Sequence, residues 1–154
     1  MADVRVSWQE NMNFVGQDDS GHMVSMDAGP IYGGMNQGIR PMELLLTAVA
    51  GCSGIELTHI LNKMRISFDS LVIDVKGQRA EDHPKIFTGI QIIYRFTGHG
   101  LIPGKVNQAL KLTDETYCSV SNMVNKAAEI SYSFEINGER YDYPFATSHE
   151  TKGV

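Results

Sequence analysis

The chain has 154 residues, of which 42% are hydrophobic and 20% charged, and its formal net charge is −5 at pH 7. This size predicts one domain with its own core, and an acidic chain without a cluster of basic residues is unlike a nucleic-acid-binding protein. Its two cysteines, Cys52 and Cys118, are too few for the disulfide framework of a small secreted protein. The first residues show no signal-peptide pattern, so we expect a cytoplasmic protein.

Residues 3–27 predict β-strands. Apolar and polar residues alternate from Val4 to Trp8, which is the period of a strand with one apolar face. Residues 14–26 predict a hairpin, because the Asp-Asp-Ser-Gly sequence at 18–21 has the composition of a turn.

The stretch 28–41 is rich in glycine and is predicted to be a flexible connector. It contains a GxxxxG spacing, but Ile39 and Arg40 follow where a phosphate-binding loop needs Lys and then Ser or Thr. A nucleotide site is therefore not favoured here.

A long central helix is predicted over residues 41–65. Pro41 at the first helical position and Glu43 in the first turn favour a helix start. Apolar residues surround almost the whole circumference, which predicts burial on most sides and hence a tight dimer in a chain of this size. The helix contains Glu56 and His59 and is predicted not to span a bilayer.

The remaining sequence predicts two strands within residues 70–97, helices within 105–130 and a closing hairpin over 131–145. The Asn-Gly pair at 137–138 is the turn signal of that hairpin. Strands linked mainly by hairpins indicate a single α+β domain over residues 1–154, with antiparallel pairing.

The two cysteines have different predicted surroundings. On a helix, Cys52 shares a face with Glu56, His59 and Lys63. His59 lies about 10.5 Å along the axis from Cys52, too far to take its proton, and Glu56 would raise a thiol pKa, so a solvated stripe is favoured. Cys118 lies at a predicted helix N-terminus, where the dipole favours the thiolate. This reasoning nominates Cys118 as the more acidic thiol, with a cysteine of no chemical role as the alternative.

Metal binding is not expected from this sequence. There is no CxxC or HExxH motif, and the five histidines are scattered along the chain. The sequence therefore predicts neither a metal centre nor a bound cofactor.

Three segments carry a specific pattern of residues. They are "RPMELLLTAVAGCSGIELTHILNKMR" (40–65), "KLTDETYCSVSNMV" (111–124) and "GQRAEDHPKIFTGIQIIY" (77–94). Together they resemble the OsmC/Ohr family, in particular its YhfA-like branch. The resemblance implies an OsmC-like α+β fold, in which antiparallel sheets wrap two long central helices of an intertwined homodimer. It also implies active sites at the dimer interface.

The family chemistry is thiol-dependent reduction of organic hydroperoxides. The resemblance implies that Cys52 is the peroxidatic thiolate, which becomes a sulfenic acid. Cys118 would then resolve it as a disulfide, and an external dithiol would reduce the pair. The implied partners are a second copy of the chain, a small hydroperoxide and this dithiol, with no nucleic acid and no membrane.

Two further positions depart from the family pattern. Peroxidase members place an arginine in the first hairpin, where this chain reads "VGQDDSG". Arg40, Arg79 and Arg5 are the candidates to replace it, in that order, because an arginine stabilises both a thiolate and a leaving alkoxide. Those members also place a glutamate directly after the proline, where this chain has Met42 with Glu43 next to it. The expected catalytic set is Cys52, Cys118, Glu43 and Arg40.

Two other interpretations stay open. One is a non-enzymatic OsmC-like dimer that binds a small apolar ligand or senses oxidants through the same cysteines, which the missing hairpin arginine favours. The other treats both cysteines as ordinary core residues. The paired cysteine segments favour the peroxidase.

Overall fold

A computed structural model describes residues 3–141, which form two compact units divided between Thr47 and Ala48. The division falls inside helix α1 (Pro41–Lys63), which begins and ends within two residues of its predicted range. The units are described separately below. Residues 142–145 of the predicted closing hairpin, and the tail that follows, lie outside the described residues.

The first unit contains a three-stranded antiparallel sheet. Its strands are β1 (Val4–Trp8), β2 (Phe14–Asp18) and β3 (Met23–Met26), in the order β1-β2-β3. The strands predicted within residues 3–27 are therefore confirmed. Their alternation does not bury an apolar face, however, because all five side chains of β1 are exposed in the single chain.

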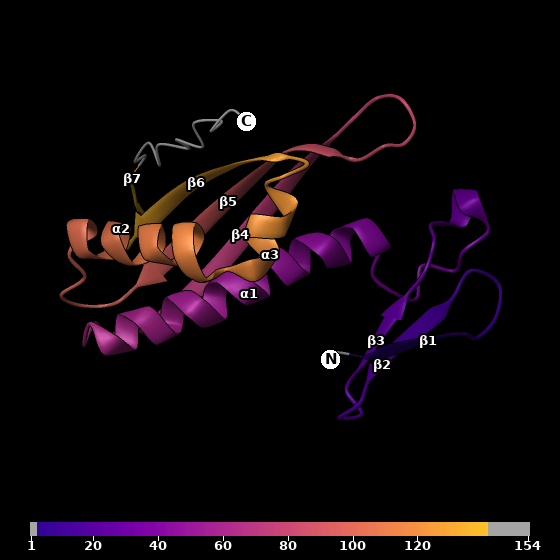
Figure 1. Ribbon diagram of the computed structural model, residues 1–154, viewed down its shortest axis with the longest axis horizontal. Helices are drawn as coiled ribbons and strands as arrows, with labels where there is room; N and C mark the ends of the chain where they lie inside the picture. The colour runs from indigo at the N-terminus through magenta and orange to yellow at the C-terminus, as the bar shows by residue number, and fades with distance from the viewer. Residues whose placement is uncertain (1–2, 142–154) are drawn as a thin grey trace, which may run out of the picture. The chain divides into compact units, whose positions relative to one another are not determined.

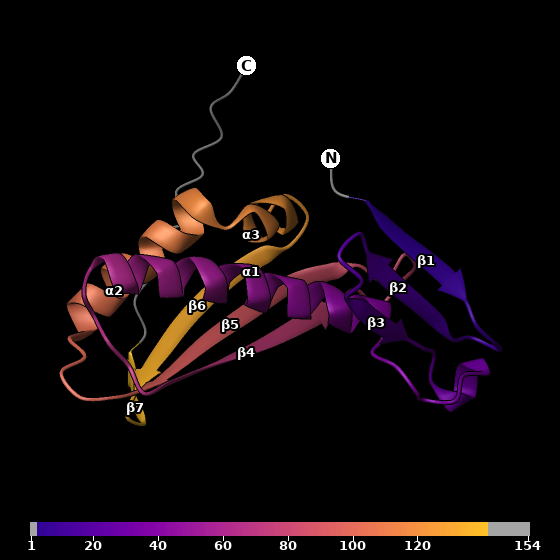
Figure 2. The same cartoon turned by 90° about the horizontal axis from the view of Figure 1, so that it is seen from below.

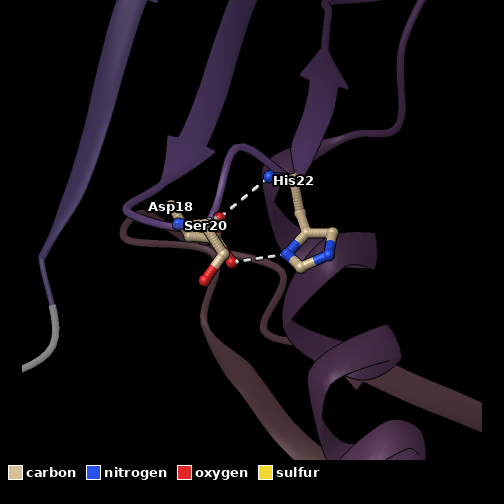
Figure 3. Close-up of polar contacts among 3 residues, drawn as sticks. All are labelled: Asp18, Ser20 and His22. Carbon is tan, nitrogen blue, oxygen red and sulfur yellow. Dashed lines mark hydrogen bonds and ion pairs between the residues drawn. The ribbon is translucent and has the colours of Figure 1, made fainter.

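The turn between β2 and β3 is closed by the Asp18 side chain (Figure 3). Its carboxylate accepts hydrogen bonds from the backbone N–H groups of Ser20, at 2.9 Å, and His22, at 2.8 Å, and it pairs with His22 Nδ1 at 2.9 Å. The side-chain bond to His22 is the main cause that lowers the pKa of Asp18. The turn predicted at residues 18–21 is confirmed, with Gly21 at a φ of 89°.

The glycine-rich stretch after β3 is an ordered loop, so the prediction of a flexible connector is wrong. Asp27 is only 2% exposed. Its carboxylate accepts hydrogen bonds from the N–H groups of Ala28 at 2.7 Å and of Met35 and Gln37 at 3.0 Å each. A buried carboxylate with three backbone donors fixes the path of the chain, and Pro30–Tyr32 forms a short 3-10 turn (η1).

Asparagine in place of Asp27 is expected to release this loop. Hydrogen bonds from the backbone, that of Gln37 first, lower the pKa of Asp27 against the opposing effect of desolvation. Because the folded-state pKa is lowered, the ionised carboxylate stabilises the loop fully at pH values above its unfolded pKa of about 3.9. This stabilisation is lost as the pH falls through the folded-state pKa. We expect the amide resonances of Met35 and Gln37 to titrate in acid in the wild type, and not in Asp27→Asn. Identical acid titrations in the two proteins would contradict this.

The second unit is built on a four-stranded sheet (Figures 1 and 2). Its strands are β4 (Ser70–Arg79), β5 (Phe87–Thr97), β6 (Glu129–Ile136) and β7 (Glu139–Tyr141), in the order β4-β5-β6-β7. The β4–β5 and β6–β7 pairs are antiparallel as predicted, but β5 and β6 are parallel. The α+β fold class is confirmed, and the parallel β5–β6 pair is a feature that the hairpin signals did not predict.

The parallel pair is joined by a helical crossover, which consists of α2 (Pro103–Leu112), one π-helical turn η2 (Thr113–Tyr117) and α3 (Ser119–Val124). The helices predicted over 105–130 therefore end earlier than expected. Met123 is 72% exposed, so the helical spacing of apolar residues there does not form a buried face. Ile130 is buried in β6 instead, opposite Ile90 of β5.

Helices α1 and α2 cross the same face of the four-stranded sheet (Figures 1 and 2). The apolar core lies between these helices and the sheet. Its largest fully buried side chains come from β5, β6 and α1: Tyr94, Phe96, Phe134, Leu57 and Leu61. On the opposite face, Arg95 of β5 forms ion pairs with Asp74 of β4, at 2.7 Å, and with Glu135 of β6. Side chains alternate between the two faces, as predicted from the sequence of these strands.

The two glycines beside Cys52 on α1 have different roles. An ideal Cβ at Gly54 would lie 2.8 Å from Ile73 Cδ1, so Gly54 lets the helix pack closely on β4. A Cβ at Gly51 would meet nothing within 4 Å, and Ile55 on the next turn is 72% exposed. The single chain therefore buries one stripe of α1, not most of its circumference as predicted.

Helix α1 is long and apolar enough to cross a membrane by length and composition alone, and the expectation that it does not span a bilayer stays a prediction. The core helix of a soluble protein has the same properties, and Leu57 and Leu61 of α1 are fully buried.

Candidate dithiol site

The structure brings the two cysteines together within the second unit. Cys52 lies midway along α1 and is half-buried, and Cys118 is the fully buried N-cap residue of α3. Burial raises the pKa of Cys118, and a smaller interaction with the Cys52 thiol acts in the same direction, so the two side chains lie near each other. Two sulfurs placed by α1 and by the crossover between β5 and β6 can therefore react with each other.

The Cys118 thiol is less acidic than its position at a helix N-terminus suggested. It lies at the N-terminus of α3 as predicted, and its sulfur accepts a hydrogen bond from the Ser121 N–H at 3.4 Å. Burial nevertheless raises the pKa of Cys118, against the lowering effect of its two bonds with Ser121. The prediction of a stabilised thiolate at Cys118 is wrong, because desolvation outweighs the short helix and its donors.

The backbone around Cys118 is held by several hydrogen bonds. Its N–H donates to Thr113 O at 2.8 Å across the π-helical turn η2. Asn122 Nδ2 donates to both Asp114 O and Cys118 O, at 3.0 Å each. Turns of this kind are common at functional sites, and here the turn sets the position of the buried sulfur.

Tyr94 of β5 is a member of the site that sequence reasoning missed. Its side chain is 1% exposed, and burial raises its pKa well above the ordinary value, with smaller contributions from the charges of Asp114, Cys118 and Cys52. An interaction with the Ser53 side chain acts in the opposite direction. The register of the sheet agrees with this placement. Tyr94 of β5 pairs with Ile73 of β4, and the Ile73 side chain lies against Gly54 of α1. The phenol is therefore a neutral, buried group that interacts electrostatically with both cysteines.

The polar stripe predicted after Cys52 borders a cleft. Glu56 is half-buried, while His59 and Lys63 are exposed, which agrees with a solvated stripe. The cleft has a volume of about 280 Å³, and its other lining residues are Ile60, Met64, Leu112 and Tyr117. Two of its lining residues are close in sequence to the cysteines. Tyr117 directly precedes Cys118, and Glu56 is one helical turn after Cys52.

Arg40 and Glu43 lie in the first unit, where they form hydrogen bonds at the start of α1 and in the loop before it. Arg40 Nη1 donates to Asp27 O at 2.8 Å and Gly38 O at 3.0 Å, and Nη2 donates to the Asn36 side chain. Glu43 Oε2 accepts a hydrogen bond from Arg40 N at 3.3 Å, which is half of a capping box.

The other two candidate arginines, Arg79 and Arg5, lie in strands. Arg79 Nε, at the end of β4, donates to Lys85 O at 2.7 Å, and Arg5 pairs with Gln17 in the first sheet. Within residues 3–141, none of the side-chain hydrogen bonds of these arginines or of Arg40 reaches a cysteine sulfur. Catalytic roles for Arg40 and Glu43 stay predictions.

No group of three or more His, Cys, Asp or Glu side chains suited to a metal ion occurs among residues 3–141.

An α+β unit with two facing thiols, one on a long helix and one on a strand crossover, defines a class of dithiol protein. The OsmC-like protein family model matches residues 34–133. The chain is similar to Protein YhfA of Escherichia coli K12, with 36% identity over 135 residues that cover 86% of this chain and 96% of the relative. The chain therefore belongs to the OsmC family and its YhfA-like branch.

Solved structures have the same fold. A hypothetical protein from Aquifex aeolicus VF5 is 33% identical and superposes with a TM-score of 0.77, covering 88% of this chain and 96% of that one. An organic hydroperoxide resistance protein from Elizabethkingia anophelis superposes with a TM-score of 0.69, covering 89% and 96% of the two chains. Its identity to this chain is only 14%, so this likeness concerns the fold.

Proposed function

We propose that this protein is a thiol-dependent peroxidase that reduces organic hydroperoxides, with Cys52 as the peroxidatic and Cys118 as the resolving thiol. The observation that carries the proposal is the juxtaposition of the two thiols with unequal burial. Cys52 is half-buried and can meet a substrate, whereas Cys118 is fully buried and burial raises its pKa. Membership in the OsmC family supports a role in redox chemistry or peroxide resistance.

The reaction follows from this division of roles. The Cys52 thiolate attacks the terminal peroxide oxygen, the O–O bond breaks, and the alkoxide leaves and takes up a proton to become an alcohol. Cys52 is then a sulfenic acid, which Cys118 converts to a disulfide with loss of water. An external dithiol returns both sulfurs to the reduced state by exchange, so no bound cofactor is required.

The proposed assembly is a homodimer in the cytoplasm. Gly51 faces open space and Ile55 is 72% exposed on α1, so a second copy has an apolar helix surface to cover. Large exposed apolar surfaces commonly mark interfaces. In this proposal an arginine, Arg40 first, supports the Cys52 thiolate in the assembled protein.

The test is rapid mixing of the reduced protein with cumene hydroperoxide. We expect stoichiometric loss of peroxide and a Cys52–Cys118 disulfide, identified by mass spectrometry of unreduced peptides. With a dithiol present, the loss becomes catalytic. Thiols that stay reduced under a large excess of peroxide would overturn the proposal.

The second candidate is a non-enzymatic dimer that binds a small apolar ligand or senses oxidants. It is favoured by one observation, namely that the donors of Arg40 are used within its own loop. Disulfide formation that is slow, and that no dithiol can turn into catalysis, would favour an oxidant sensor over an enzyme.

A further inference from the structure

The sulfur of Cys118 is held by a second residue that the peroxidase chemistry alone does not require. Ser121 Oγ lies 3.1 Å from Cys118 Sγ, and the Ser121 N–H donates a hydrogen bond to the same sulfur at 3.4 Å. Cys118 is 0% and Ser121 1% exposed. Bulk water therefore does not compete for these contacts, and both belong to one turn at the start of α3.

We propose that Ser121 is the positioning residue of the resolving step, which holds Cys118 Sγ beside Cys52 and donates hydrogen bonds to the charge that develops on this sulfur. The inference rests on the proposed peroxidase function. It assigns to Ser121 the stabilising part that a neighbouring cation has at other reactive thiols.

The chemical step shows why such a residue is needed. Cys118 Sγ attacks the sulfur of the Cys52 sulfenic acid, the S–O bond breaks, and the Cys118 proton leaves with the hydroxide as water. The hydroperoxide has already supplied the two oxidising equivalents, so the step needs no further oxidant. A buried thiol must lose its proton here, which desolvation disfavours. A fixed N–H and a rotatable hydroxyl are two donors that reduce this cost.

The other groups around Cys118 do not provide this help. The titratable groups that interact with it are Cys52 of α1 and Tyr94 of β5, and Asp114 of η2 acts on Tyr94. Each of them is neutral or anionic, so each opposes a thiolate or leaves it unaided. The favourable interactions with the Cys118 sulfur come from Ser121.

The first measurement uses no peroxide and so is independent of the enzymatic proposal. In a Cys52→Ser background, the thiolate absorbance of Cys118 is titrated with and without Ser121→Ala. We expect a higher apparent pKa in Ser121→Ala and in a second variant, Ser121→Gly, and recovery towards the parent value in Ser121→Thr. Ser119→Ala is the matched control, because Ser119 is exposed. Unchanged titration in both folded variants would overturn the inference.

The second measurement follows the two oxidation phases by rapid mixing in the Cys52-containing protein. We expect Ser121→Ala to leave the oxidation of Cys52 unchanged and to slow disulfide formation about tenfold, as for loss of one hydrogen bond to a charged group. The difference should narrow as the pH rises. Disulfide formation at the wild-type rate and with the wild-type pH profile would overturn the inference, whereas absence of any Cys52 oxidation in the wild type would instead reject the peroxidase.

Discussion

Replacement of Cys52 with serine is expected to abolish reaction with cumene hydroperoxide. A serine hydroxyl is not ionised at neutral pH and is a far weaker nucleophile than a thiolate. Cys118 cannot take over the role, because it is fully buried and burial raises its pKa. The loss should be at least about a thousandfold, on the scale of removing a catalytic nucleophile, and is measured as the initial rate of peroxide consumption.

Cys118→Ser is the matched variant and should behave differently. It keeps Cys52, so one equivalent of peroxide should still be consumed at close to the wild-type rate. The reaction should then stop at the sulfenic acid, which a dimedone adduct on Cys52 would report. Equal loss of the first oxidation in both variants would contradict the assigned roles, and fast oxidation in Cys52→Ser would reverse them.

Gly34→Ala is expected to disrupt the loop between β3 and α1. An ideal Cβ at Gly34 would lie 2.1 Å from Ala28 O and 2.4 Å from Ala28 C. This contact is with backbone, and the Ala28 N–H is bonded to the buried Asp27 carboxylate, so neither side can move cheaply. We expect a loss of stability of about 3 kcal/mol, measured by urea unfolding, with faster proteolysis within residues 28–40.

Gly29→Ala in the same loop is the control. Gly29 has a φ of −73°, which alanine adopts freely, and its nearest contact would be Arg40 Nη2 at 3.7 Å. Its stability should stay within about 0.5 kcal/mol of the wild type. Similar losses in the two variants would show that the close contact with Ala28 is not the cause.

The strands and turns were predictable because their signals are local. The Asn-Gly pair adopts φ values of 51° and 86°, as a tight hairpin turn between β6 and β7 requires. The start of α1 was equally local, since Pro41 begins the helix and Glu43 accepts a hydrogen bond from Arg40 N. The family assignment rested on segments of this kind and is confirmed by the comparisons.

The features that sequence reasoning missed depend on contacts between distant residues. The parallel pairing of β5 with β6 is made through the helical crossover, which no local periodicity reports. Tyr94 occupies an inward position of β5 and has the sequence signal of an ordinary core residue. For Cys118, the helix N-terminus was visible in the sequence, but the burial that outweighs it was not. Asp27 could have been suspected only from an acidic residue beside a glycine-rich loop.

The placement of the cysteines has a consequence for folding as well as for chemistry. Cys52 lies on α1 before β4, and Cys118 lies after α2, so a bond between them would enclose both strands β4 and β5 in one covalent ring. Closing a ring of this size removes freedom from the unfolded chain worth about 4 kcal/mol in the loop-entropy model. The oxidised protein would then be harder to denature than the reduced one. Exposure to peroxide would therefore raise the stability of the fold, and reduction of the disulfide would reverse this.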